Sequence, residues 1–221
     1  MQIKLNRNEV LRYCSVKTDF DNLENGLKNK FLSIIKFCED NYNFSFCHRV
    51  FDIEKHENHI DVCKTQLKLF GNDIKNHLKD CDKCILLALS LGTWADRTCA
   101  KYSALSQTDS LIFDGCMTEL IEQLADQTCF ELQKQYGAIT SRFGPGYGDL
   151  PLNIQKSFIN IIGADKKMGI TVVNNLMIPL KTITAVIGIY NKDKIEQKNI
   201  KLKKCINKCD SCENKCEFYK P

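Results

Sequence analysis

The residues best suited to ligand chemistry lie in a loop at 141–151, which reads Ser-Arg-Phe-Gly-Pro-Gly-Tyr-Gly-Asp-Leu-Pro. Its glycines allow positive φ or a close backbone approach to a ligand, and its prolines stiffen it. Arg142 can hold a carboxylate through two parallel hydrogen bonds, and Tyr147 offers an aromatic face with a hydroxyl. A helix is expected to follow, and its first amide groups favour an anion. These residues suit a ligand with a carboxylate and a flat or cationic part, although an ordinary strand-to-helix turn has a similar composition.

Four cysteines crowd into the end of the chain, at Cys205, Cys209, Cys212 and Cys216. Four thiolates in a polar, lysine-rich stretch have little use in a core and fit tetrahedral zinc or an iron–sulfur cluster. The spacing matches neither the common zinc ribbon nor a standard ferredoxin run, so both metals remain open. The alternative is a redox-exposed tail that holds no ligand.

Two other groups of metal-type or redox-type residues are expected to be structural. Cys81 and Cys84 form a Cys-x-x-Cys motif, but Cys84 begins an apolar run that is typical of a buried strand. His56 and His59 belong to a polar His-Glu-Asn-His stretch that favours a surface loop over a metal site. No Ser-His-Asp order, P-loop or Rossmann glycine fingerprint is present in the sequence.

The segment Arg142-Phe-Gly-Pro-Gly-Tyr147, of the form RxxPGY and followed by Pro151, resembles the motif of the activation domain of cobalamin-dependent methionine synthase. The resemblance extends to LNRNEVLRY at 5–13, which is similar to the start of stand-alone members of this family. It extends also to 73–92, with its His-Leu pair, its cysteine and its strand ending in Leu-Gly, and to 169–188 around Met-Ile-Pro. The match covers most of residues 5–190, and the loop is its most specific part.

The resemblance implies that the chain binds S-adenosylmethionine and presents its methyl group to cobalamin that has been oxidised to cob(II)alamin. A reductant such as flavodoxin or ferredoxin would supply one electron, and methyl transfer would restore methylcobalamin. Carried over residue by residue, Arg142 would hold the ligand carboxylate, while Gly144, Gly146 and Tyr147 would form the pocket wall. Glu122 would match an acidic ligand contact, although a solvated helix face is the alternative.

The leading hypothesis is therefore an accessory protein that acts in trans on a cobalamin-binding methionine synthase lacking its own activation domain. Such a protein is expected to show no turnover alone, because the cobalt supplies the nucleophile and the module supplies positioning. The chain lacks a match to an aspartate near the start of the family's domain and to a tyrosine pair near its end. The alternative is an iron–sulfur or zinc protein that docks on a corrinoid protein or transfers electrons to it.

Composition narrows the remaining classes of function. The 221 residues carry a net charge of +4, and residues 191–221 contain nine lysines against five acidic residues, so the preceding body is neutral. A neutral body argues against a nucleic-acid partner, because phosphate neutralisation needs a concentrated basic surface. The start has no apolar signal core, and the longest apolar stretch, at 84–91, is too short to span a membrane. The odd total of 13 cysteines then favours the reducing cytoplasm.

Hydrophobic periodicity and turn residues predict interleaved helices and strands. Helices are predicted at 8–14, 21–41, 72–79, 93–104, 108–135 and 152–162, and extended segments at 44–53, 59–69, 83–91, 137–143, 169–174 and 182–190. Asn72 is the predicted cap of the third helix. Without a regular βαβ repeat, the pattern indicates an α+β fold with a twisted, mainly antiparallel sheet flanked by helices. We expect one domain over 1–190 and a cysteine-rich tail over 191–221.

Overall fold

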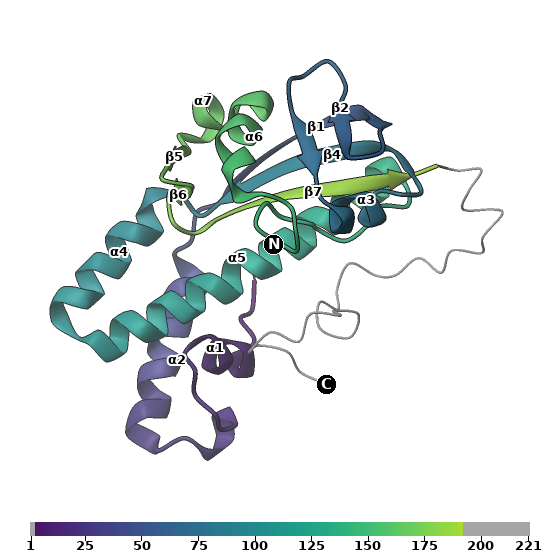
Figure 1. The fold of residues 1–221 in the computed structure, drawn as a ribbon. Helices are drawn as coiled ribbons and strands as arrows, with labels where there is room; N and C mark the ends of the chain where they lie inside the picture. The colour runs from purple at the N-terminus through teal and green to yellow at the C-terminus, as the bar shows by residue number, and fades with distance from the viewer. Residues whose placement is uncertain (1–2, 192–221) are drawn as a thin grey trace. The chain divides into compact units, whose positions relative to one another are not determined.

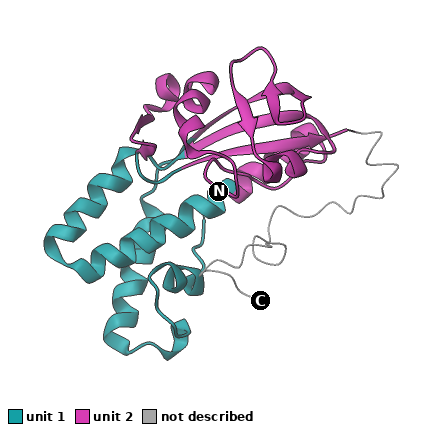
Figure 2. Ribbon diagram, viewed as in Figure 1, with its two compact units in different colours: residues 1–45, 90–125, 179–182 teal, residues 46–89, 126–178, 183–221 magenta. Residues whose placement is uncertain are grey.

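The computed structural model describes residues 3–191, and its contacts group them into two compact units (Figure 2). Among the described residues, unit 1 comprises 3–45, 90–125 and 179–182. Unit 2 comprises 46–89, 126–178 and 183–191. The candidate binding loop at 141–151 therefore lies in unit 2, whereas Glu122 lies in unit 1.

Unit 1 is helical (Figure 1). It contains α1 (Arg7–Tyr13), the 3-10 turn η1 (Phe20–Asn22), α2 (Asn25–Asp40), α4 (Gly92–Leu105) and the first part of α5 (Gln107–Tyr136). The short helix predicted after Asn6 is confirmed by α1. The Asn6 side chain caps it by accepting hydrogen bonds from the amides of Asn8 and Glu9. The helices predicted at 93–104 and 108–135 match α4 and α5 within two residues.

The predicted apolar face of α2 is confirmed, because Phe31, Ile34, Ile35 and Cys38 are all buried. The helix begins at Asn25, however, and not at residue 21 as predicted. Leu23 and Glu24 have extended ψ angles of 144° and 140°, which separate the short turn η1 from the helix. Hydrophobic spacing alone missed this break, because Leu23 and Leu27 continue the helical period across it.

Unit 2 is built on a five-stranded antiparallel sheet in the order β3-β2-β1-β4-β7 (Figure 1). The strands are β1 (Ser45–Lys55), β2 (His59–Val62), β3 (Lys68–Phe70), β4 (Cys81–Ser90) and β7 (Thr182–Tyr190). The stretch predicted as extended at 59–69 is two strands, β2 and β3, joined by a turn in which Lys64 adopts a φ of 62°. The strands β1, β2 and β3 form an antiparallel meander.

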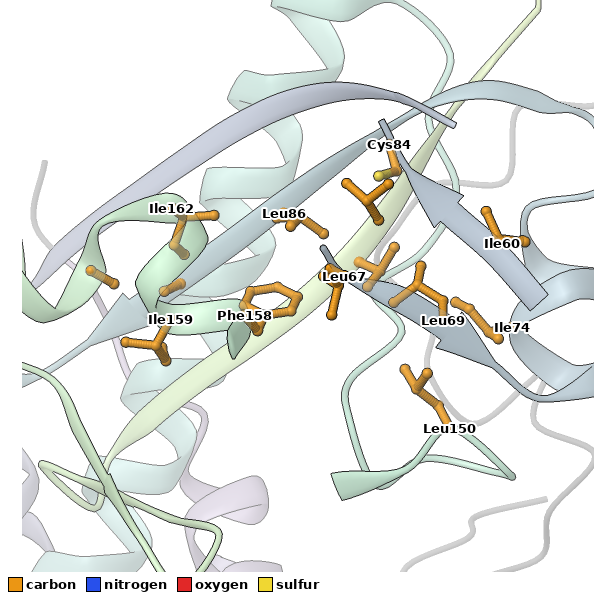
Figure 3. Close-up of a cluster of buried hydrophobic side chains, with 14 of the residues drawn as sticks. Ile60, Leu67, Leu69, Ile74, Cys84, Leu86, Leu150, Phe158, Ile159 and Ile162 are labelled. Carbon is orange, nitrogen blue, oxygen red and sulfur yellow. The ribbon is translucent and has the colours of Figure 1, made fainter. Parts of the chain in front are cut away.

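The central strand β4 explains why its sequence is apolar without alternation. Cys84, Leu86 and Ala88 pack into a cluster on one face of the sheet, whereas Ile85 and Leu87 pack on the other. Figure 3 shows the first cluster, in which Leu86 lies among side chains of α6 (Gln155–Ile162) and of strands β2 and β3. On the opposite face, Ile85 and Leu87 meet residues from the end of α5. A strand covered on both faces needs apolar side chains at every position, because successive residues point in opposite directions.

Smaller elements complete unit 2. They are α3 (Asn72–His77), η2 (Leu152–Ile154), α7 (Ala164–Met168), β5 (Thr171–Val173) and β6 (Leu176–Ile178). The strand predicted at 169–174 is the first arm of a β5–β6 hairpin, whose turn residues Asn174 and Asn175 have φ angles of 49° and 64°. Positive φ at both central residues is the requirement of the tight hairpin turn that Asn-rich pairs favour.

The predicted α+β class is confirmed, with helices packed on an antiparallel sheet. The predicted division into residues 1–190 and a tail stays a prediction, and the four tail cysteines lie outside the described residues. Within residues 3–191, none of the helices has the length and apolarity needed to cross a bilayer.

Candidate functional site: the Arg142–Pro151 loop

The loop starts from a segment that adds to the edge of β7. Ile139 and Phe143 form antiparallel bridges with Ile189 and Val186 of that strand. The backbone amide of Phe143 donates to the Val186 carbonyl at 3.0 Å, and the Val186 amide donates back at 2.8 Å. The predicted extended segment at 137–143 is thus an incomplete edge strand, and its pairing with β7 fixes where Arg142 enters the loop.

Arg142 is held by an acidic residue of α5. Its Nη2 donates a hydrogen bond to Oδ1 of Asp126 at 2.7 Å, and only 10% of the Arg142 side chain is exposed. Burial raises the pKa of Asp126, and the neighbouring Arg142 charge acts in the opposite direction. The orientation of the guanidinium therefore depends on a carboxylate of the same unit.

The Pro-Gly pair builds a tight turn. The amide of Tyr147 donates to the Gly144 carbonyl at 3.0 Å, which closes a four-residue turn with Pro145 and Gly146 at its centre. Gly146 has a φ of 89°, as the third position of a type II turn requires. Gly144 lies so close to β7 that an added Cβ would be 3.2 Å from the Thr184 carbonyl oxygen. The positive φ of Gly146 is the use predicted for the loop glycines, whereas the close approach of Gly144 is to β7.

Tyr147 projects from this turn. Its side chain is 62% exposed, and its ring meets Phe143 edge to face with the centroids 6.3 Å apart. Phe143 in turn packs against the buried cluster of unit 2 and lies 5.1 Å from the His77 ring. The chain thus presents one exposed aromatic face on a rigid turn, while its aromatic neighbour anchors that turn to the core.

The second half of the loop is fixed to α3. Both side-chain oxygens of Asp149 accept hydrogen bonds from the first amides of that helix, those of Asn72 and Asp73. Asn72 was the predicted cap, but the helix begins at Asn72 itself, after Gly71, and no Asn72 side-chain cap forms. The prediction was wrong because the capping carboxylate comes from a residue far along the chain, which local sequence signals do not reveal.

His77 connects α3 to the beginning of the loop. Its Nε2 lies 3.0 Å from the Ser141 carbonyl oxygen and 2.8 Å from Thr140 Oγ1. The carbonyl can only accept, so Nε2 carries the proton and donates. Burial lowers the pKa of His77 to about 4, and the bond to Ser141 partly opposes this shift. The imidazole is therefore neutral at physiological pH and serves as a positioning group beside Arg142.

The remaining residues singled out in the sequence, within the described part of the chain, include Glu122 on α5 and the Cys81–Cys84 pair on β4. Glu122 lies on α5 in unit 1 and is half-buried, and its assignment as a ligand contact stays a prediction. Cys81 and Cys84 are fully buried on β4, and burial raises the pKa of Cys84 to about 12, which confirms the structural interpretation of this pair. Asp126 and His77 were not predicted to contact the loop, since each approaches it only through the fold. Asp149 belongs to the loop, but its contact with α3 was not predicted.

Unit 2 also contains a cleft of about 620 Å³. Its lining residues are Arg49, Val50, Phe51, Lys64, Thr65, Gln66, Ser157, Asn160 and Ile161. None of them belongs to the loop. Arg49, an arginine of the same unit, lines this cleft, and its Nη1 donates to the Ile161 carbonyl at 2.9 Å.

Comparisons with known proteins identify the fold. No family model and no curated protein matches the chain. Among solved structures, the chain is similar to the crystal structure of the MetH reactivation domain bound to AdoHcy, with a TM-score of 0.58 and 10% sequence identity. The match covers 81% of this chain and 74% of that one. The protein therefore has a fold like that of the reactivation domain, as its resemblance to the activation domain of methionine synthase predicted.

Proposed function

We propose that this protein binds S-adenosylmethionine at the Arg142–Pro151 loop and acts in trans to reactivate a cobalamin-dependent methionine synthase. The observation that carries this proposal is the joint placement of an oriented guanidinium, a glycine-built turn and an exposed aromatic ring in one loop. The likeness to a reactivation domain that was crystallised with AdoHcy supports the same ligand class.

The residues present fit such a ligand. S-adenosylmethionine carries a carboxylate and an ammonium group at its amino-acid end, and the Arg142–Asp126 pair offers one charge of each sign. Its sulfonium and adenine suit the face of Tyr147, because aromatic rings attract cations and stack on flat rings. The absence of a Cβ at Gly144 and Gly146 lets the turn pack closely against Thr184 and Leu152, because an added Cβ would lie 3.2 Å from an atom of each. In the proposed site the backbone of these two glycines forms the pocket wall.

Glu122 keeps its proposed role as an acidic ligand contact. It is a half-buried acidic side chain of α5, the helix that also carries Asp126. Exchange of Glu122 for Gln removes the charge with little change of shape, so this variant tests the electrostatic contribution alone. We expect weaker binding of the sulfonium ligand, since a negative charge near a cation favours its bound state.

In the proposed reaction, S-adenosylmethionine and cob(II)alamin of the partner synthase are both substrates. One electron from a flavodoxin or ferredoxin reduces the cobalt, a cobalt–carbon bond forms, and the sulfonium carbon–sulfur bond breaks with its electron pair passing to sulfur. The products are methylcobalamin and S-adenosylhomocysteine. This chain contributes orientation, because Arg142 and Tyr147 hold the two ends of the donor so that its methyl group faces the partner.

The test is a reconstitution with a cobalamin-bearing synthase that lacks its own activation domain, a reducing system and S-adenosylmethionine. Conversion of cob(II)alamin to methylcobalamin is followed by absorbance, with and without this chain. We expect conversion only with the chain present and a loss of at least tenfold in Arg142→Ala, from the removal of a charge-assisted contact.

The same assay separates the proposal from the alternative of a metal-dependent docking or electron-transfer protein. For that alternative, Cys209→Ser abolishes conversion while Arg142→Ala leaves it intact. The opposite pattern favours ligand binding at the loop. Equal conversion without the chain contradicts both functions.

A further inference from the structure

The β1–β2 hairpin brings three metal-type side chains together, and the candidate ligand-binding loop does not use them. His59 and Asp61 are two residues apart on β2 and therefore point to the same face of the strand. His56 lies in the turn before β2, and its amide donates to the His59 carbonyl at 2.9 Å. The two imidazole rings are stacked with their centroids 4.7 Å apart.

The ligand atoms of these three residues have the spacing of a metal centre. Nε2 of His56 lies 3.0 Å from Asp61 Oδ2, and Nε2 of His59 lies 3.2 Å from Asp61 Oδ1. One ligand atom from each residue lies within 4.8 Å of the others. Bonds of about 2.0–2.1 Å in tetrahedral geometry place ligand atoms about 3.3 Å apart, so little movement is needed to surround an ion.

We propose that His56, His59 and Asp61 form a binding site for a divalent transition metal ion of the zinc type. Imidazole nitrogen and carboxylate oxygen are ordinary zinc ligands, and three protein ligands leave a fourth position for water. The motif His-x-x-His-x-Asp supplies all three ligands from one hairpin. The ligands are therefore brought together by local pairing and need no rearrangement of the sheet.

The neighbouring Lys68 shows that these side chains already attract a positive charge. Its Nζ lies 3.3 Å from His59 Nε2 and 3.6 Å from Asp61 Oδ1. A single imidazole nitrogen cannot donate to the Asp61 carboxylate and accept from the Lys68 ammonium in one protonation state. A metal ion in place of the ammonium accepts an electron pair from both imidazoles and from Asp61. Half of the Lys68 side chain is exposed, so it can turn into solvent.

The hairpin is also held in position from outside. Nζ of Lys75, on α3, donates to the Glu57 carbonyl in the turn at 2.5 Å. Nζ of Lys55 donates to the Lys79 carbonyl at 2.8 Å. On the third strand, the Phe70 ring lies 5.3 Å from the His59 ring and restrains it. These contacts preorganise the imidazoles, which reduces the entropy lost when a metal ion binds.

The experiment uses the full chain with Cys205, Cys209, Cys212 and Cys216 all changed to serine, so that zinc cannot bind to the tail thiolates. The chain has four histidines, so each ring signal can be followed by NMR during titration with zinc chloride. We expect one equivalent of zinc to shift the His56 and His59 signals and to leave those of His48 and His77 in place.

Calorimetric titration of variants gives the affinity. We expect His59→Ala to weaken zinc binding about tenfold or more, and the control His48→Ala to leave it unchanged. Lys68→Met removes the competing ammonium and is expected to bind zinc several-fold more tightly.

Three results overturn the proposal: unchanged His56 and His59 signals at saturating zinc, equal affinities in His59→Ala and His48→Ala, or no tighter binding in Lys68→Met. The ring signals are read with both histidines in place, so this test does not depend on the folding of a variant.

Discussion

Arg142 illustrates how the fold can orient a single charged side chain. Its guanidinium is mostly buried and bonds to Asp126, so the charge-carrying group has a fixed direction at the base of the loop. Lysine cannot replace it with the same geometry, because the planar guanidinium presents several donors in a rigid fork. At the residue scale, the proposed function therefore depends on geometry as well as on charge.

Tyr147 provides the first prediction at this scale. Because its side chain is 62% exposed, Tyr147→Ala is expected to change the free energy of unfolding by less than about 0.5 kcal/mol. The same variant is expected to weaken S-adenosylmethionine binding about tenfold, through loss of the aromatic face. Tyr147→Phe keeps that face and is expected to bind nearly as wild type does. Calorimetry and urea unfolding measure the two effects, and equal ligand affinity in Tyr147→Ala would contradict the assigned role.

His77 provides a prediction about pH. Its pKa is about 4 in the folded protein, against an ordinary value of 6.5, because burial disfavours the charged imidazolium. Between these values the unfolded chain binds a proton that the folded chain does not. The contribution to stability is thus complete above pH 6.5 and is lost as pH falls towards 4, by at most about 3 kcal/mol.

The measurement is urea unfolding of wild type and His77→Gln at several pH values between 4 and 7. Glutamine retains a donor for the Ser141 carbonyl but does not titrate. We expect the stability of the wild type to rise more steeply with pH across this range. Parallel pH profiles for the two proteins would show that His77 does not carry this dependence.

At the scale of elements, the loop and helix α3 form one structural unit. Asp149 binds the first amides of α3, His77 at the end of α3 binds the Ser141 carbonyl, and Leu150 is buried in the adjacent cluster. Gly71 and Gly148 are both required, because an added Cβ at either position would lie about 2 Å from an aspartate oxygen of the other segment. The loop is therefore held at both ends by a helix that precedes it by some 60 residues.

Asp149 gives the prediction at this scale. Asp149→Ala removes the acceptors for the amides of Asn72 and Asp73 and is expected to lower the free energy of unfolding by about 1–2 kcal/mol. Asp149→Asn keeps one side-chain carbonyl acceptor and is expected to cost less, since asparagine is a good helix cap. Urea unfolding ranks the three proteins. An alanine variant as stable as the asparagine variant would contradict the capping role.

Elements with a strong local pattern were predictable from the sequence. The helices α4 and α5 and the strand β4 were found from periodicity and apolar runs. The positive φ of Gly146 and Gly148 is one of the two uses predicted for the loop glycines. The loop itself was identified because Arg142, Pro145 and Tyr147 combine unusual residue types in six positions. These signals are local, so they can be recognised in the sequence without knowledge of the fold.

Contacts between distant segments were not predictable. Asp126 follows the Glu122 position by one helical turn, yet nothing in the sequence shows that it meets Arg142. The pairing of Asp61 with two histidines likewise appears only when β2 is formed and the turn folds back. The separation of η1 from α2 and the turn between β5 and β6 were not predicted. Hydrophobic periodicity alone does not mark breaks of two or three residues.

At the scale of the whole molecule, a reactivation-domain fold is kept at 10% sequence identity to the MetH domain. A core of this kind needs the right apolar pattern and volume more than particular residues, as the two-faced packing of β4 illustrates. Function depends on far fewer positions, so the fold alone does not establish it. Ligand binding at the Arg142–Pro151 loop, as proposed, can be tested directly by substitutions in that loop.

The most direct test is calorimetric titration of the full-length protein, purified anaerobically, with S-adenosylmethionine. Arg142→Ala is compared with Arg49→Ala, a matched loss of an arginine that lines the separate cleft of the same unit. We expect saturable binding by the wild type and by Arg49→Ala, and at least a tenfold loss in Arg142→Ala. Absence of binding by the wild type, or a loss confined to Arg49→Ala, would contradict the assignment of the ligand site to the Arg142–Pro151 loop.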